Sequence, residues 1–122
     1  ILSDHPYFDY FDWAHLNTVS YQPEEKTILV CARNLHSVFK IDWEKEELIW
    51  ILCDTGFWKG TPYEDKVLMP QGEIAFCYQP HAAYFLPGSE EGRKRLIIYD
   101  NHWHKRRPVE SFDQDKKSYV RI

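Results

Sequence analysis

The feature of the sequence that most constrains its fold is a series of short apolar runs separated by polar turns. The runs are rich in Val, Ile, Phe and Tyr, which is typical of β-strands. They lie at 14–21, 27–33, 37–42 and 47–52. Connections this short join antiparallel neighbours and leave no room for the crossover that parallel strands need. We therefore predict a four-stranded antiparallel sheet, which is either one blade of a β-propeller or one sheet of a sandwich.

A second, looser copy of this pattern follows a long loop. Residues 53–78 have no regular period and carry several glycines and prolines, so a loop with one helical turn is expected there. The copies match at 15–21 and 81–86, at 27–34 and 95–101, and at 37–41 and 118–122. In this alignment a histidine, His15 or His81, stands at the head of the first strand of each copy.

The predicted organisation is all-β, with residues 1–122 as a single fragment of a propeller domain. It consists of a blade at about 12–52, the loop 53–78 and a second, partial blade at about 79–122. A blade needs neighbours on both faces, so about two blades predict further blades of an incomplete β-propeller. The first residue is Ile rather than Met, which favours a chain processed or excised from a longer protein. Uncovered blade faces also allow a homodimer.

The composition narrows the function classes. The chain has 122 residues and a formal net charge of −4, so we do not expect nucleic acid as a partner. No apolar run approaches the roughly 18 residues of a membrane-crossing helix, so neither a span nor an intact signal peptide is expected. Three cysteines without a CxxC pair exclude a zinc ribbon. Two alternatives stay open for them: three buried thiols, or one disulfide and one free thiol.

His15 is the first candidate site residue. The alternation of a strand over 14–21 predicts that His15, Asn17 and Val19 lie on one face. A polar pair on an aromatic-rich strand needs partners. One interpretation is a structural histidine bonded to Asp12 or to a backbone carbonyl. The other is a site residue.

Arg33 and His81 complete the candidate cluster. Arg33 ends an apolar strand, where its guanidinium must reach solvent, a carboxylate or an anion. If the two copies are adjacent blades, the heads of their first strands face one channel, and His15 and His81 converge there. Two histidines and an arginine suit a tetrahedral oxyanion, because a neutral imidazole can attack sulfur or phosphorus while the guanidinium binds the oxygens.

The other histidines are expected to have no role in catalysis. His102 and His104 have the spacing of two ligands on one strand face, but three basic residues follow them directly and oppose a dication. We therefore expect a solvated loop and no metal site. His5 and His36, in a lead-in and a hairpin turn, are expected at the surface.

The motifs in these strands resemble those of the bacterial arylsulfate sulfotransferases. That family has an Asp-aromatic-x-His-x-Asn-Ser-Val opening, a strand that ends in Ser-Arg, Lys-Ile-Asp and Ile-x-Trp-x-Leu strands, and a Gln-His opening with a Leu-Phe-Asp-Asn strand in the next blade. The matching segments are Asp12 to Val19, Ala32 to Arg33, Lys40 to Asp42, Ile49 to Leu52, Gln79 to His81 and Ile98 to Asn101. The resemblance covers most of 12–52 and 79–122.

The resemblance implies a six-bladed propeller enzyme of the periplasm or exterior. Such an enzyme moves a sulfuryl group from an aryl sulfate to a phenolic acceptor by a ping-pong cycle, without a nucleotide donor or other cofactor. By motif, His81 is the histidine that is transiently sulfated, and His15 and Arg33 hold the sulfuryl oxygens. Asn17 and Asn101 are expected to contact substrate. A further histidine from an earlier blade is also needed, so residues 1–122 alone are expected to be inactive.

Two other functions remain as alternatives. The first is a propeller-type binding or scaffold module that keeps the blade motifs without catalysis. The second is a metal-dependent hydrolase that uses His15, His81, His102 and His104. A further blade with a channel-facing histidine would favour the enzyme over the scaffold, and metal analysis would identify the hydrolase.

Overall fold

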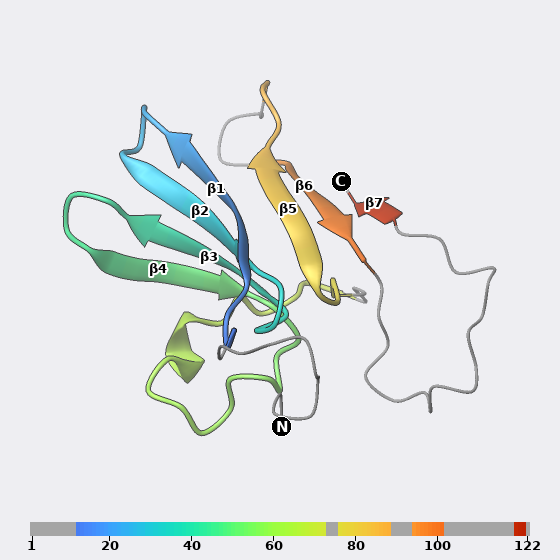
Figure 1. Ribbon diagram of the computed structural model, residues 1–122. Coiled ribbons are helices and arrows are strands. Elements are labelled where there is room, and N and C mark those ends of the chain that lie inside the picture. Colours follow the sequence, from blue (N-terminus) through green and yellow to red (C-terminus); the bar gives the residue numbers. More distant parts are fainter. Residues whose placement is uncertain (1–11, 73–75, 89–93, 102–118, 122) are drawn as a thin grey trace.

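A computed structural model of the chain describes residues 12–72, 76–88, 94–101 and 119–121 (Figure 1). These residues form two antiparallel sheets, one with the strand order β1-β2-β3-β4 and one with the order β5-β6-β7. In Figure 1, β5 runs beside the first sheet, and of the strands in that sheet β1 and β2 contact β5 most. The two sheets therefore pack together through β5.

The first sheet contains the four strands that the apolar runs predict. They are β1 (Leu16–Gln22), β2 (Thr27–Ala32), β3 (Ser37–Asp42) and β4 (Glu47–Leu52). Each strand pairs antiparallel with the next one along the chain, and the register of β2 on β3 is unbroken. This is the up-and-down order of a propeller blade.

Three tight turns join these strands, and each turn ends with a residue in the left-handed region. Lys26, His36 and Glu46 have φ values of 54°, 49° and 58°. The third turn is also fixed by Asp42, whose carboxylate accepts hydrogen bonds from the backbone N–H groups of Glu44 and Lys45, at 3.1 and 3.0 Å. These hydrogen bonds, led by the one from Lys45, lower the pKa of Asp42.

The second sheet contains β5 (Pro80–Phe85), β6 (Leu96–Asp100) and β7 (Tyr119–Arg121). The loop that follows β4 along the chain makes one short helical turn, η1 (Glu64–Lys66), before β5 begins, as the sequence predicts. Val67 then forms a bridge to Ile51 of β4. The bridge joins the loop to the edge of the first sheet, and Trp58 of the loop packs against Phe39 of β3, so the loop covers part of one face.

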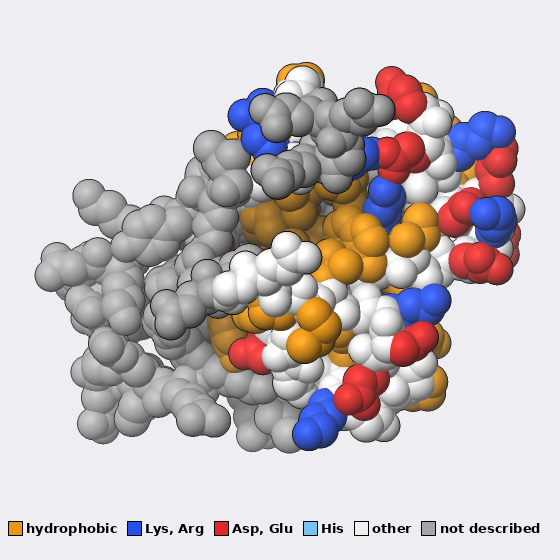
Figure 2. Space-filling model, turned by 180° about the vertical axis from the view of Figure 1, so that it is seen from behind, with side chains coloured by type: hydrophobic (Ala, Val, Ile, Leu, Met, Phe, Trp, Pro, Cys, Tyr) orange, Lys and Arg blue, Asp and Glu red, His pale blue; other side chains and the backbone are white. Residues whose placement is uncertain are grey.

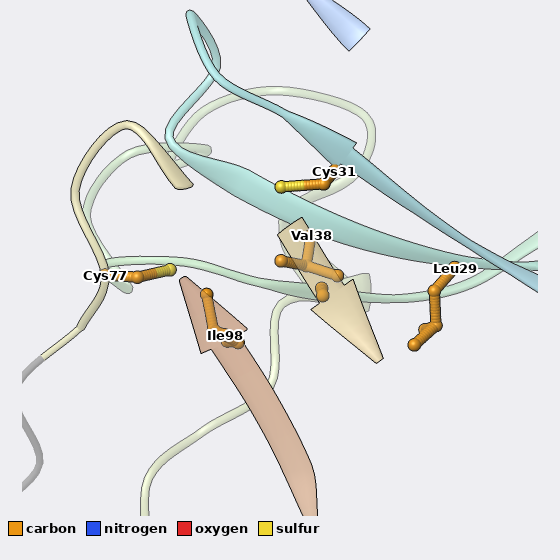
Figure 3. Packing of buried hydrophobic residues seen from close by; sticks show 6 residues of the cluster. Leu29, Cys31, Val38, Cys77 and Ile98 are labelled. Atoms are coloured by element: carbon orange, nitrogen blue, oxygen red, sulfur yellow. The ribbon is translucent and has the colours of Figure 1, made fainter. Parts of the chain in front are cut away.

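Two groups of buried side chains form the core. The larger group lies between the sheets and contains Leu29, Cys31, Val38, Cys77, Ala83 and Ile98 (Figure 3). The smaller group, under the loop, contains Ile51, Cys53 and Val67. All three cysteines are buried free thiols, which is one of the two alternatives that the sequence leaves open.

The fold class is the predicted one. The regular secondary structure of the described residues is almost entirely β, every strand pair is antiparallel, and the sheets are consistent with blades of an incomplete β-propeller. Among these residues, no helix is long and apolar enough to cross a membrane.

The predicted match between the two histidines is wrong. Each sheet has an irregularity at the start of its first strand, between Leu16 and Thr18 in β1 and between Pro80 and Ala82 in β5. The extra residue is Asn17 in β1 and His81 in β5. His81 therefore occupies the position of Asn17, two residues beyond the equivalent of His15.

The residue equivalent to His15 is Gln79. His15 and Gln79 both precede their strands, and both have a φ of 50°. Because β1 begins at Leu16 and is irregular before Thr18, the alternation that was expected to put His15 on one face with Asn17 and Val19 does not apply. Two segments of different sequence thus adopt the same bulged entry.

Candidate functional site

The candidate site lies where β1 begins, β2 ends and β5 begins. The backbone N–H of Arg33 donates to the carbonyl of His15 at 3.0 Å, which ties the end of β2 to the entry of β1. The hydroxyl of Thr18 donates to the carbonyl of His81 at 2.9 Å, which ties β1 to β5. His15, Arg33 and His81 therefore lie at the same end of the two sheets.

Asp12 orients His15. One carboxylate oxygen of Asp12 accepts the backbone N–H of His15 at 3.0 Å, and the other contacts Nδ1 of the ring. A carboxylate on Nδ1 holds the proton there and leaves Nε2 as the nitrogen that faces a ligand. The bond to Asp12 is the one that the structural interpretation of His15 anticipated. The same bond also suits an oriented site histidine, and the side chain is 39% exposed.

Among the described residues, the guanidinium of Arg33 has one hydrogen-bond partner. Its Nη1 donates to the side-chain oxygen of Asn34 at 3.3 Å, and Asn34 in turn donates to the backbone carbonyl of Asp12 at 2.8 Å. A guanidinium has five N–H donors, so this contact leaves a fork for an anion. Within the described part of the chain, no carboxylate lies within ion-pair distance of Arg33, so of the three partners that the sequence allows, the carboxylate is not found there.

His81 is an exposed side chain on a firmly held backbone. It is the bulged residue of β5, and its ring meets the ring of Tyr99 edge-on, with 6.0 Å between the centroids. The backbone carbonyl groups of Gln79 and Pro80 also accept hydrogen bonds. Asn101 donates to the carbonyl of Gln79 at 2.9 Å, and Asn17 donates to that of Pro80 at 3.5 Å.

These last two contacts add a role to Asn17 and Asn101. Both were predicted to contact substrate, and both use their side-chain N–H groups on the segment that leads into His81. Substrate binding by Asn17 and Asn101 stays a prediction. This other role could not be predicted from the sequence, because each contact joins residues more than 20 positions apart, 63 for Asn17 and 22 for Asn101.

His36 is a residue whose contacts the sequence did not reveal. It was expected at the surface, but its ring packs against Tyr78, with 4.4 Å between the centroids, and meets Phe57 edge-on at 5.5 Å. Its Nδ1 accepts the backbone N–H of Gln79 at 3.1 Å. His36 is half-buried as a result. A polar turn residue carries no signal of such a contact 43 positions away.

The described residues contain no group of three or more His, Cys, Asp or Glu side chains that could hold a metal ion. His102 and His104, the pair with ligand-like spacing, lie outside the described residues, as does His5. The chemistry that the described site offers is therefore that of an oriented imidazole, a guanidinium fork and an exposed imidazole.

The fold and this cluster define a propeller-type β protein with histidines and an arginine at one end of neighbouring blades. The sequence model of the arylsulfotransferase (ASST) family matches residues 7–122, and the chain belongs to this family. A comparison with curated proteins returns no match to the chain. The family membership agrees with the resemblance found in the sequence and supports an activity of the arylsulfotransferase type.

Proposed function

We propose that the protein transfers a sulfuryl group from an aryl sulfate to a phenolic acceptor, through a sulfated His81 and without a nucleotide donor. The observation that carries this proposal is the hydrogen bonding between the blades. Thr18, next to the His15 entry, holds the backbone of His81, while His15 and Arg33 share a hydrogen bond of their own. A nucleophile and an anion-binding pair thus belong to one end of the molecule.

In the first half-reaction, a ring nitrogen of His81 attacks the sulfur of the donor. The new S–N bond forms as the bond from sulfur to the aryl oxygen breaks, and the phenolate leaves with that electron pair. His15, in its protonated form, gives the phenolate its Nε2 proton, while Asp12 keeps the Nδ1 proton in place. A nitrogen nucleophile divides one difficult transfer into two easier ones.

The second half-reaction returns the enzyme to its starting state. The acceptor phenol gives its proton to Nε2 of His15, and its oxygen attacks the sulfur on His81. The S–N bond breaks, and His81 recovers its electron pair. Arg33 acts in both halves, because its fork binds the sulfuryl oxygens as charge develops on them.

The resemblance to the sulfotransferases extends this proposal beyond the described residues. A further histidine from an earlier blade of a six-bladed ring completes the site, so residues 1–122 alone are inactive. The partners are the two small substrates, and no cofactor takes part. A periplasmic or secreted location follows from the same resemblance.

Initial rates of the intact protein test the proposal. With a chromogenic aryl sulfate as donor and a simple phenol as acceptor, double-reciprocal plots at several acceptor concentrations should be parallel, since the donor's phenol leaves before the acceptor binds. Intersecting lines would contradict a sulfated intermediate. No release of phenol would favour a scaffold, and loss of activity with a chelator would favour a metal-dependent hydrolase.

A further inference from the structure

The segment from Tyr78 to His81 is held by five hydrogen bonds that come from three separate parts of the chain. The backbone N–H and carbonyl groups of this segment form hydrogen bonds with the side chains of Asn17, Thr18, His36, Asp100 and Asn101. Three of these side chains belong to the first sheet or its turns. Much of what fixes this segment therefore comes from the neighbouring blade.

Gln79 is the residue in this segment that most needs support. Its φ of 50° lies in the left-handed region, and it directly precedes Pro80. The ring of a proline disfavours helical conformations in the residue before it and favours extended ones. A left-handed residue at this position is strained and persists only where the surroundings fix it.

His36 and Asn101 hold Gln79 from its two sides. Nδ1 of His36 accepts the N–H of Gln79, and the amide of Asn101 donates to its carbonyl. Because Nδ1 accepts, the proton of the neutral His36 ring is on Nε2. The φ of Pro80 is fixed by its ring, so the conformation of Gln79 largely sets the direction in which His81 leaves the bulge.

We propose that His36, in the turn between β2 and β3, is the positioning residue for His81. Its Nδ1 keeps Gln79 in the left-handed conformation and thereby aims the imidazole of His81 from the neighbouring blade. This inference rests on the proposed function, because it takes His81 as the nucleophile. His36 itself touches no reacting atom.

Two substitutions separate the hydrogen bond from the ring packing. His36→Asn keeps an acceptor near the position of Nδ1 and tolerates the left-handed turn, but it loses the ring. His36→Phe keeps a ring against Tyr78 and Phe57 but has no acceptor. Glu46→Asn is the matched control, because Glu46 has the same left-handed place in the turn between β3 and β4, with a φ of 58°.

The experiment is a single-turnover measurement on the intact protein with an aryl sulfate donor and no acceptor. The rate at which His81 becomes sulfated should fall about 10- to 100-fold in His36→Phe, while the donor KM stays close to that of the wild type. His36→Asn should keep most of the rate, and Glu46→Asn should equal the wild type. Hydrogen exchange at the Gln79 amide should be faster in His36→Phe alone.

Three outcomes would overturn the inference. They are a wild-type rate in His36→Phe, an equal loss in His36→Phe and His36→Asn, and unchanged exchange at the Gln79 amide in His36→Phe. If His36→Phe does not fold, Asn101→Leu removes the hydrogen bond on the other side of Gln79 and should lower the same rate. A wild-type protein that turns over without sulfate on His81 would instead refute the proposed function.

Discussion

His15 and Arg33 meet through the hydrogen bond between their backbones, and each side chain is set by a neighbour. Asp12 holds the ring of His15, and Asn34 accepts from the guanidinium of Arg33. At this scale, we expect the proposed site to depend on the fork of Arg33 as much as on its charge.

Arg33→Lys tests the fork. Lysine keeps the positive charge but presents a single point donor, so it cannot bind two sulfuryl oxygens in one plane. We expect the substitution to cost about 2 to 4 kcal/mol of transition-state stabilisation, as for the loss of one oxyanion donor. The measurement is kcat/KM of the intact protein for a chromogenic aryl sulfate.

The control for this substitution is Arg95→Lys. Arg95 is exposed and donates to the carbonyl of Pro87, close to the turn that joins β5 and β6. It should leave kcat/KM unchanged. An Arg33→Lys protein that is as active as the Arg95→Lys protein would exclude a role for the fork.

The buried thiols give a test that depends on pH. Burial, together with the nearby Cys77, raises the pKa of Cys31 to about 12, against an ordinary value of 9.0. Since the thiolate is the reactive form, alkylation of Cys31 at pH 8 should be roughly 100-fold or more slower in the native protein than in the unfolded one. Peptide mapping after timed alkylation measures this, and equal rates would contradict the burial of Cys31.

The same shift makes stability fall at high pH. The pKa of the Cys31 thiol is higher in the folded than in the unfolded protein. The contribution of this thiol to stability is therefore complete below pH 9 and is lost as the pH rises toward 12. Burial also raises the pKa of Cys53, to about 11, so the two thiols act in the same direction.

Residue types and local spacing made part of the site predictable. The sequence indicated Asp12 as a partner of His15, because the two are three positions apart. It could not indicate that His36 reaches Gln79, because that contact depends on how two sheets pack. The polar character of the turn predicts only exposure.

At the scale of elements, strands were predictable and bulges were not. The four strands of the first sheet begin and end within two residues of the predicted limits, since alternation and turn residues are local signals. A bulge adds one residue without changing the apolar pattern. The matching of His81 with His15 failed because it paired residues of the same type, whereas the bulge that both strands share places His81 level with Asn17.

An ion cluster joins elements of the two sheets at the opposite end from His15. Glu25, in the turn after β1, contacts both Lys40 of β3 and Lys94, which precedes β6. The ammonium groups lie over the ring of Phe85, at 5.4 Å for Lys40 and 5.1 Å for Lys94. Figure 2 shows hydrophobic side chains gathered in the middle of one face, with basic and acidic ones along the border.

Glu25→Gln should destabilise the protein. Burial lowers the pKa of Lys40, whose side chain is only 11% exposed, so its charge depends on Glu25 for compensation. We expect the free energy of unfolding in urea to fall by about 1 to 3 kcal/mol, the cost of a poorly solvated group that has lost its charged partner.

Two further variants control this prediction. Lys40→Met removes the buried charge, so no carboxylate is needed to compensate it, and the methionine keeps the apolar part of the side chain. The Lys40→Met protein should therefore be more stable than the Glu25→Gln protein. Glu44→Gln breaks the pair with Lys26, in which both side chains are 58% exposed, and should change stability little. A Glu25→Gln protein as stable as Glu44→Gln would show that the cluster contributes nothing.

At the scale of the whole molecule, part of one face of the first sheet is uncovered, where β1 ends and β3 turns into β4. Val19, Tyr21 and Trp43 are 61%, 55% and 62% exposed. Val19 and Tyr21 lie opposite Val30 and Ile28 of β2, so they extend an apolar surface. Exposed apolar patches of this kind mark contacts with another surface.

We predict that residues 1–122, expressed alone, self-associate through this face. The double variant Tyr21→Ser and Trp43→Ser should lower the apparent mass in light scattering. Met69→Ser is the control, because Met69 is 74% exposed but lies in the loop, outside this face. A folded wild-type monomer at high concentration would contradict the prediction.

The central claim is that His81 carries the sulfuryl group, and its most direct test is to capture that group. The intact protein is mixed with an aryl sulfate in the absence of acceptor, stopped rapidly under conditions that preserve an S–N bond, and digested. Mass spectrometry should find one sulfuryl group on the peptide that contains His81, and adding a phenol before the stop should remove it. Phenol release at the wild-type rate from His81→Ala, or sulfate found only on another residue, would contradict the account.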